Sequence, residues 1–243
     1  MEYYSQSYQD KFIDRILFRQ KENGVFVEIG AYDGISFSNS FFFEKNRSWR
    51  GICIEPTPRA FNELCKNRKC ICVNGCISDS DGEAELILLE GYSAMLSGLK
   101  QDYDPRHSER IENEIKRFGG EKKSLKVRTI NFNNLMLKYG TAHIDYCSID
   151  VEGGEWKILQ SINFDIISID VITVENNFSD SRFIDFLANK GYDYVGKLEA
   201  DQVFIRQGRS DLRYLKRMCK EYNMICKLNH FFSRVLRFNA LFV

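Results

Sequence analysis

A short apolar run that leads into a glycine turn constrains this chain most, because the unit that it begins recurs along the sequence. Residues 25–29 (VFVEI) are followed at once by the turn sequence GAYDG at residues 30–34. Short apolar runs of this kind are typical of buried parallel strands. Strand and helix patterns then alternate to residue 206. This alternation predicts an α/β fold, with a mostly parallel sheet covered by helices on both faces.

The pattern predicts the individual elements as well. Sheet strands are expected at residues 25–29, 51–55, 70–76, 144–150, 167–175, 192–198 and 202–207. Helices are expected at residues 36–46, 56–66, 133–139, 153–162 and 181–190. The Asp81–Gly82 turn predicts a hairpin strand at residues 84–89, and a further short strand is expected at 127–130. One α/β unit over residues 1–208 accounts for these elements.

Two segments interrupt this rhythm. Residues 91–124 combine Gly, Ser, Asp and Pro with a charged helix pattern around 109–118, which indicates an insertion or lid over a site. Residues 209–243 carry eight Lys or Arg against two Asp or Glu, with apolar residues at helical spacing. This tail is interpreted in two ways. It forms a basic amphipathic helix that contacts an anionic membrane or a partner, or it is a helix packed on the body.

Charge and composition restrict the class of protein. Lys plus Arg and Asp plus Glu both number 34, and this balance argues against a nucleic-acid-binding protein. The sequence shows no signal-peptide pattern and no run of 18 apolar residues. The eight cysteines are expected to be reduced thiols. We therefore expect a cytoplasmic protein, which residues 209–243 could hold at the cytoplasmic face of a membrane.

The turn after the first strand indicates which cofactor it binds. Its spacing, Glu28-x-Gly30-x-x-x-Gly34, is neither the dinucleotide G-x-G-x-x-G pattern nor a P-loop. An acidic residue, Glu55, ends the next strand, where it could accept hydrogen bonds from both hydroxyls of a ribose. Together these features favour S-adenosylmethionine over NAD(P) or ATP. The alternative is an ordinary tight turn with Glu55 as a solvated cap.

A second group of polar residues follows two later strands. Asp150 ends one strand, and Glu175 and Asn176 end the next, so they should face one cleft. Methylation of a hydroxyl needs a base or a metal that activates it. Asp150 and Glu175 are therefore candidate bases, and with Asn176 they are candidate ligands for Mg²⁺ or Mn²⁺. Alternatively, Asp150 only binds the cofactor. His107, in the insertion, is a further candidate base, although a solvated loop histidine is the simpler interpretation.

The chain resembles the FkbM family of S-adenosylmethionine-dependent methyltransferases over residues 5–206. The order and spacing of several segments carry this resemblance, and they are residues 5–13, 25–40, 49–58, 77–86, 144–159, 172–176 and 191–205. The resemblance implies a class I methyltransferase fold, Rossmann-like, with seven strands of which the last is antiparallel. It also implies O-methylation by a domain spanning residues 1–208. Ser148 departs from the family, which often has Lys at this position.

The resemblance also implies a set of cofactor-binding residues. Carried over by position, they are Gln9, Glu28, Gly30, Ala31, Asp33, Gly34, Glu55, Ser78, Asp79 and Asp150. Glu28, Gly30 and Asp33 would surround the methionine part of the cofactor. Ser78 and Asp79 would contact the adenine edge.

The same resemblance also implies how the ribose is held, what covers the cofactor and which acceptor is methylated. Glu55 would hold the ribose, and Gln9, with Gln6 beside it, would fold over the bound cofactor. The family implies that the acceptor is a hydroxyl of a sugar in a glycan or other saccharide. Two alternatives stay open. One is methylation of a peptide or small metabolite, and the other is a non-catalytic protein that binds S-adenosylmethionine or a partner.

Overall fold

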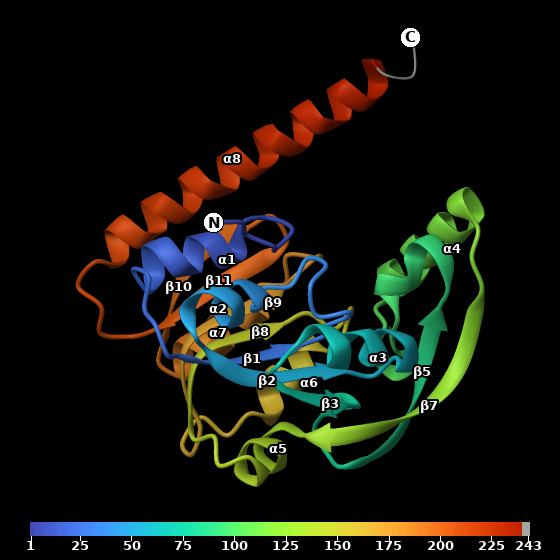
Figure 1. The fold of residues 1–243 in the computed structure, drawn as a ribbon, viewed down its shortest axis with the longest axis horizontal. Helices are drawn as coiled ribbons and strands as arrows, with labels where there is room; N and C mark the ends of the chain where they lie inside the picture. Colours follow the sequence, from blue (N-terminus) through green and yellow to red (C-terminus); the bar gives the residue numbers. More distant parts are fainter. Residues whose placement is uncertain (240–243) are drawn as a thin grey trace.

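The central sheet contains seven strands (Figure 1), and the computed structural model describes residues 1–239 of the chain. Its strands are β1 (Val25–Ile29), β2 (Arg50–Glu55), β3 (Ile71–Asn74), β8 (His143–Ile149), β9 (Ser168–Glu175), β10 (Tyr192–Leu198) and β11 (Asp201–Arg206). Their order is β10-β11-β9-β8-β1-β2-β3, and β11 runs in the direction opposite to that of the other six strands. The prediction of a class I methyltransferase sheet is therefore confirmed.

Helices cover both faces of this sheet, and the apolar residues on its two sides form two clusters. One face carries α5 (Phe132–Lys138), α6 (Glu155–Ser161) and α7 (Arg182–Asn189). The other carries α1 (Gln9–Phe12), the π-helical turn η1 (Ile13–Leu17), α2 (Phe41–Arg47), α3 (Pro58–Asn67) and the start of α8 (Leu212–Asn239). Strand alternation explains the division, because successive side chains point to opposite faces. In β1, Phe26 packs in one cluster and Val27 in the other.

The register of the parallel strands aligns their carboxyl ends. Ile29 of β1 pairs with Ile54 of β2 and with Ile149 of β8. The residues that follow these three strands therefore meet at one edge of the sheet. The antiparallel β11 begins at the same edge, since Asp201 lies opposite Glu175 of β9.

A second, four-stranded sheet lies beside the first. Its strands are β4 (Cys76–Ser78), β5 (Gly82–Leu89), β6 (Gly98–Leu99) and β7 (Lys122–Asn131), in the order β4-β7-β5-β6. Residues 90–121 connect β5 to β7 and contain η2 (Gly91–Leu96), β6, η3 (Lys100–Asp102) and α4 (Pro105–Phe118), so the insertion expected over residues 91–124 ends inside β7. Figure 1 shows β5 and β7 as a curved arm with α4 above it.

Three predictions about local elements are wrong in detail. The helix expected at 36–46 begins only at Phe41. The strand expected at 70–76 divides at Gly75, whose φ of 155° separates β3 from β4. The strand at 84–89 is present, but it pairs with β7 and β6 rather than with the strand before the Asp81–Gly82 turn. In the last two cases long-range pairing decides the structure.

The tail forms one long helix, α8, whose contacts with the body extend from Leu215 to Asn229, which donates to the Tyr8 hydroxyl at 3.0 Å. Leu215, Cys219 and Cys226 are buried, whereas Ile225 and Leu228 are exposed. Figure 1 shows α8 passing over α1 and then extending beyond the body. The tail's residues 240–243 lie outside the described residues. In the described chain, no helix has both the length and the apolar character needed to cross a membrane.

Two polar contacts of α8 reach the edge of the sheet where the strands end. The Cys226 thiol lies 3.0 Å from the carbonyl oxygen of Ser7, in the N-terminal segment. The Asn223 side chain accepts a hydrogen bond of 2.8 Å from the backbone N–H of Glu199, which lies between β10 and β11. The helix therefore braces two separate segments of the chain.

Candidate active site

A cleft with a volume of about 370 Å³ lies at the carboxyl edge of β1, β2, β8 and β9, and we call it the main cleft. The N-terminal segment, the turn after β1 and residues 94–99 of the insertion contribute to its walls. Of the predicted site residues, those that line it are Gln9, Glu28, Gly30, Ala31, Glu55, Asp150 and Glu175. More than half of the predicted site residues thus share one cavity.

The turn after β1 holds three strand ends together. The backbone N–H groups of Gly30 and Ala31 both donate to the Ile54 carbonyl at 3.0 Å, and Asp150 N–H donates to the Ile29 carbonyl at 3.0 Å. Gly30 has a φ of 87°, and a Cβ atom there would overlap the Asp150 carbonyl oxygen. Only glycine fits this position, because it alone tolerates both the left-handed backbone and the close approach.

Glu28 lines the main cleft, but its carboxylate is already satisfied by the protein. It accepts hydrogen bonds from the Asn39 backbone N–H at 2.6 Å and from the hydroxyls of Ser38 and Ser40. Arg68 lies 3.3 Å away. These bonds hold residues 38–40 in a loop, which explains why the predicted helix starts late. The structure thus gives Glu28 a positioning role, and its contact with a cofactor stays a prediction.

Glu55 is buried at the end of β2, with 5% of its surface exposed. One carboxylate oxygen accepts from Tyr32 N–H at 2.9 Å, and the other accepts from the N–H and hydroxyl of Thr57 at 2.8 and 2.6 Å. Burial raises the pKa of this carboxyl. The alternative of a solvated cap is therefore wrong, because Glu55 joins the turn to β2 inside the cleft.

Four predicted cofactor residues lie elsewhere. The described lining of the main cleft does not include Asp33, Gly34, Ser78 or Asp79, although it includes Ile77. The Asp33 carboxylate instead accepts hydrogen bonds from the N–H groups of residues 35 and 36 and shapes the turn. Cofactor contact by these four residues stays a prediction.

The N-terminal segment closes the cleft from one side. The Gln9 side chain donates to the Asp201 carboxylate and accepts from Ser7 N–H at 2.8 Å. Gln6 and Ser7 line the cleft beside it. Sequence analysis missed Asp201, which is 6% exposed. The one available signal was the antiparallel last strand, whose first residue must lie where the parallel strands end.

Five carboxyl groups come together between the strand ends, and we call them the acidic cluster: Asp150, Glu152, Glu155, Glu175 and Asp201. Burial, together with the neighbouring negative charges, raises the pKa of Asp150 to about 7, that of Glu152 to about 8 and that of Glu155 to about 7. The same two causes raise the pKa of Glu175 well above its usual value. Such a cluster is destabilised by its own charge, so it favours a cationic ligand.

Two buried acceptors on the cleft wall support this inference. Asn39 Oδ1 and Glu152 Oε2 have no hydrogen-bond donor within the described chain. Buried acceptors without partners are costly, and a ligand that carries N–H or O–H donors would satisfy them. Glu152 also has a φ of 57°, an unusual conformation for this residue that turns the loop after β8 toward the cleft.

The structure changes the expected roles of His107 and Asn176. His107 lies in α4 with 2% of its surface exposed, so its interpretation as a solvated loop residue is wrong. Its Nδ1 atom is 3.6 Å from Glu152 Oε2, and burial lowers its pKa. The Asn176 amide is occupied by two hydrogen bonds of 2.8 Å with the backbone of Asp180. Glu155 joins Asp150 and Glu175 in a group of carboxyl residues whose oxygens lie within 4.8 Å of one another. A metal-ligand role for Asn176 stays a prediction.

A second pocket of about 290 Å³ adjoins the main cleft. Asp102, Glu152, Glu175 and Asn177 line both cavities, so carboxyl groups of the acidic cluster form the wall between them. On its other sides the second pocket is lined by aromatic and polar residues, including Tyr103, His107, Trp156 and Phe178. Two ligands bound in these cavities would meet at the acidic cluster.

Comparison with known proteins gives one match to a family. A family model described as "Methyltransferase FkbM domain" matches residues 28–194, which is more than half of the chain but less than the resemblance over residues 5–206. No curated protein matches the sequence.

Several solved structures are similar at low identity. A methyltransferase FkbM from Methylobacillus flagellatus is 10% identical, with a TM-score of 0.47 over 83% of this chain and 48% of that one. A precorrin-6y C5,15-methyltransferase from Geobacter metallireducens is 12% identical, with a TM-score of 0.39 over 81% and 85% of the two chains. Aeropyrum pernix fibrillarin, with bound S-adenosyl-L-methionine, is 12% identical, with a TM-score of 0.40 over 76% and 66%.

Proposed function

Since the chain belongs to the FkbM methyltransferase family, we propose that it is an S-adenosylmethionine-dependent O-methyltransferase whose acceptor is a hydroxyl of a saccharide. The observation that carries this proposal is the acidic cluster between two adjoining cavities. One cavity suits a cationic cofactor and the other suits an acceptor. The acceptor class comes from the family resemblance, and a peptide or small metabolite is the alternative.

The main cleft fits S-adenosylmethionine in charge and in hydrogen bonding. When bound, this cofactor supplies an electrophilic methyl group on a positively charged sulfur. It also carries an ammonium group, whose N–H donors match two buried oxygens that accept no hydrogen bond in the described chain: Asn39 Oδ1 and Glu152 Oε2, the latter 3.7 Å from Arg110 Nη1. The buried Glu55 carboxylate lies at the end of β2, where it could accept from ribose hydroxyls. Gln9 would hold the N-terminal segment over the ligand through Asp201.

Asp150 is the proposed general base. Its pKa of about 7 suits proton abstraction near neutral pH, because a base works best when its pKa is close to the working pH. The acceptor oxygen would attack the methyl carbon as the carbon–sulfur bond breaks, and the electron pair of that bond would stay on sulfur. The hydroxyl proton would pass to Asp150. Glu175, which shares a hydrogen bond with Asp150, would hold that carboxylate in place.

A divalent cation is a second way to activate the acceptor. Asp150, Glu155 and Glu175 offer carboxylate oxygens within 4.8 Å of one another, and Mg²⁺ or Mn²⁺ prefers oxygen ligands. Such an ion would lower the pKa of the acceptor hydroxyl. Loss of turnover in EDTA, with recovery on adding Mg²⁺ or Mn²⁺, would favour this version over direct proton transfer.

Replacing Glu55 tests the cofactor site. We expect Glu55→Gln to weaken binding of S-adenosylhomocysteine about tenfold or more, because a hydrogen bond to a charged group contributes roughly 1.5–3 kcal/mol. Calorimetric titration measures the dissociation constant. The matched control is Glu63→Gln on the outer face of α3, where the carboxylate is half-exposed and should not affect binding. Unchanged affinity in a folded Glu55→Gln protein would contradict the proposed ribose contact.

The proposal for the tail is that α8 contacts an anionic lipid surface, which would place the protein at the cytoplasmic face of a membrane. Its exposed side includes Met224, Ile225 and Leu228, with Lys220 and Lys227 also exposed. Apolar side chains flanked by basic ones are typical of helices that bind at membrane interfaces.

Vesicle co-sedimentation tests this contact. We expect the double change Lys220→Gln and Lys227→Gln to weaken binding to acidic vesicles, because each basic residue near such a surface contributes about 1 kcal/mol. Raised salt should weaken wild-type binding too. The double change Lys122→Gln and Lys126→Gln on exposed β7 is the charge-matched control. A wild-type protein that ignores acidic vesicles at low salt would contradict the proposal.

A further inference from the structure

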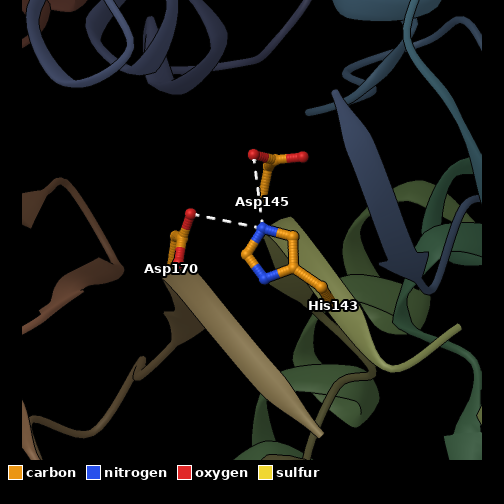
Figure 2. Close-up of side chains that lie close together, drawn as sticks. All are labelled: His143, Asp145 and Asp170. Atoms are coloured by element: carbon orange, nitrogen blue, oxygen red, sulfur yellow. Dashed lines mark ion pairs between the residues drawn. The ribbon is translucent and has the colours of Figure 1, made fainter. Parts of the chain in front are cut away.

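A histidine and two aspartates form a second cluster far from the main cleft. His143 and Asp145 lie on β8, two residues apart, and Asp170 lies on the neighbouring β9. Figure 2 shows one imidazole nitrogen directed toward both carboxylates. The cluster lies where these strands begin, so the length of β8, roughly 20 Å at about 3.3 Å per residue, separates it from the cleft.

The spacing of this cluster suits metal ligands better than hydrogen-bonding partners. His143 Nε2 lies 3.7 Å from Asp145 Oδ1 and 3.5 Å from Asp170 Oδ2. Hydrogen bonds between such atoms are normally about 2.7–3.2 Å long. Two ligands about 2.1 Å from a tetrahedral zinc ion are about 3.4 Å apart. A zinc ion between the three atoms would therefore need only small movements of the side chains.

The surroundings also resemble those of a metal site. His143 Nδ1 lies 2.8 Å from the Ser168 hydroxyl, which orients the ring. The second oxygen of Asp145 accepts from Val25 N–H at 2.7 Å, so the backbone of β1 holds that carboxylate. Partners of this kind orient the ligands in known metal sites. His143 is half-exposed and Asp170 about one-third exposed, so an ion and its water ligand can enter.

We propose that His143, Asp145 and Asp170 form a Zn²⁺ site, with solvent as the fourth ligand. One imidazole and two carboxylates are ligands that zinc accepts in tetrahedral sites. In the structure the Lys21 ammonium group contacts Asp145 Oδ1, the oxygen that faces His143. Lys21 therefore competes with an ion for this oxygen, and zinc has to displace it from Asp145. Its side chain is 43% exposed, so it can move into solvent.

The competition with Lys21 gives a test with two opposite outcomes. We expect the full-length protein to bind one Zn²⁺ in a titration against a chromophoric chelator. His143→Ala and Asp170→Asn should weaken this binding at least tenfold, while Lys21→Ala should strengthen it several-fold. A purely structural ion-pair cluster predicts neither the binding nor the gain. The control is Asp185→Asn, an exposed aspartate on α7 that should change nothing.

A stability measurement and a second metal complete the test. Zinc should raise the melting temperature of the wild type but not of His143→Ala, because only a protein that binds the ion is stabilised. Cobalt bound in place of zinc should show no thiolate charge-transfer band, which separates this site from any site built on cysteines. Absence of zinc binding by the wild type, or equal binding by wild type and His143→Ala, would overturn the proposal. S-adenosylhomocysteine affinity should be independent of zinc, so failure here leaves the proposed function untouched.

Discussion

Replacing Asp150 by Asn should lower the rate of methyl transfer by about 10²-fold or more while leaving S-adenosylhomocysteine affinity nearly unchanged. The change keeps the side-chain shape but removes the group that would accept the hydroxyl proton, and acid–base catalysis typically contributes about 10²–10⁴-fold. The assay is release of S-adenosylhomocysteine with saccharides extracted from the host cells. Mass spectrometry of cellular glycans, with wild type or variant expressed, provides the readout in cells.

The other outcomes of this experiment are equally specific. Near-normal turnover in Asp150→Asn would move the base to Glu175 or His107, which both line the second pocket. Calorimetry separates a catalytic defect from lost binding, because only the latter changes the dissociation constant. A wild-type protein that binds S-adenosylhomocysteine but transfers no methyl group to saccharides, peptides or small metabolites would support the non-catalytic alternative.

Replacing Arg68 by Met should lower the free energy of unfolding by about 3–5 kcal/mol, the usual cost of removing one partner of a buried ion pair. The Arg68 side chain is fully buried between two carboxylates, with Glu44 at 2.9 Å and Glu28 at 3.3 Å. It also donates to the Ser40 hydroxyl at 2.8 Å. Without it, both carboxylates lose their counterion in an apolar environment. Urea denaturation measures the loss.

Two further variants make the Arg68 experiment decisive. Lys66→Met removes a cation from the last turn of α3, two residues before Arg68, but its ion pair with Glu63 is exposed and should contribute less than about 1 kcal/mol. Arg68→Lys keeps the positive charge but loses the planar fork of donors, so an intermediate effect is expected. A loss below about 1 kcal/mol in Arg68→Met would show that the 38–40 loop does not depend on this ion pair.

The residues that the sequence placed correctly are those whose position follows from local pattern and strand direction. Gly30, Glu55 and Asp150 each follow or end a predicted parallel strand, and such strands present their carboxyl ends at one edge. No knowledge of side-chain packing is needed to bring them together. The same reasoning correctly predicted that Glu175 faces the cleft.

The residues that the sequence misplaced depend on contacts between distant segments. Asp201 joins the acidic cluster because β11 inserts antiparallel between β9 and β10, and no local pattern specifies that insertion. Residues 36–40 have a plausible helix pattern, yet the buried Glu28 carboxylate binds their backbone and hydroxyl groups instead. His107 was expected in a solvated loop, but α4 begins at Pro105 and one side of this helix packs against β5 and η2.

Because α8 contacts two segments that line the main cleft, binding of the proposed cofactor and docking of this helix would be thermodynamically linked. Cys226 contacts Ser7, beside the Gln9 that covers the cleft, and Asn223 contacts Glu199, next to Asp201. Any opening of the main cleft that separates these two segments from each other would also break contacts of α8. Coupling between two binding events is reciprocal. If binding of α8 to a surface raises the affinity of the cleft for the cofactor by some factor, a filled cleft raises the affinity of α8 for that surface by the same factor. Slower release of product at a membrane would be the kinetic sign of this coupling.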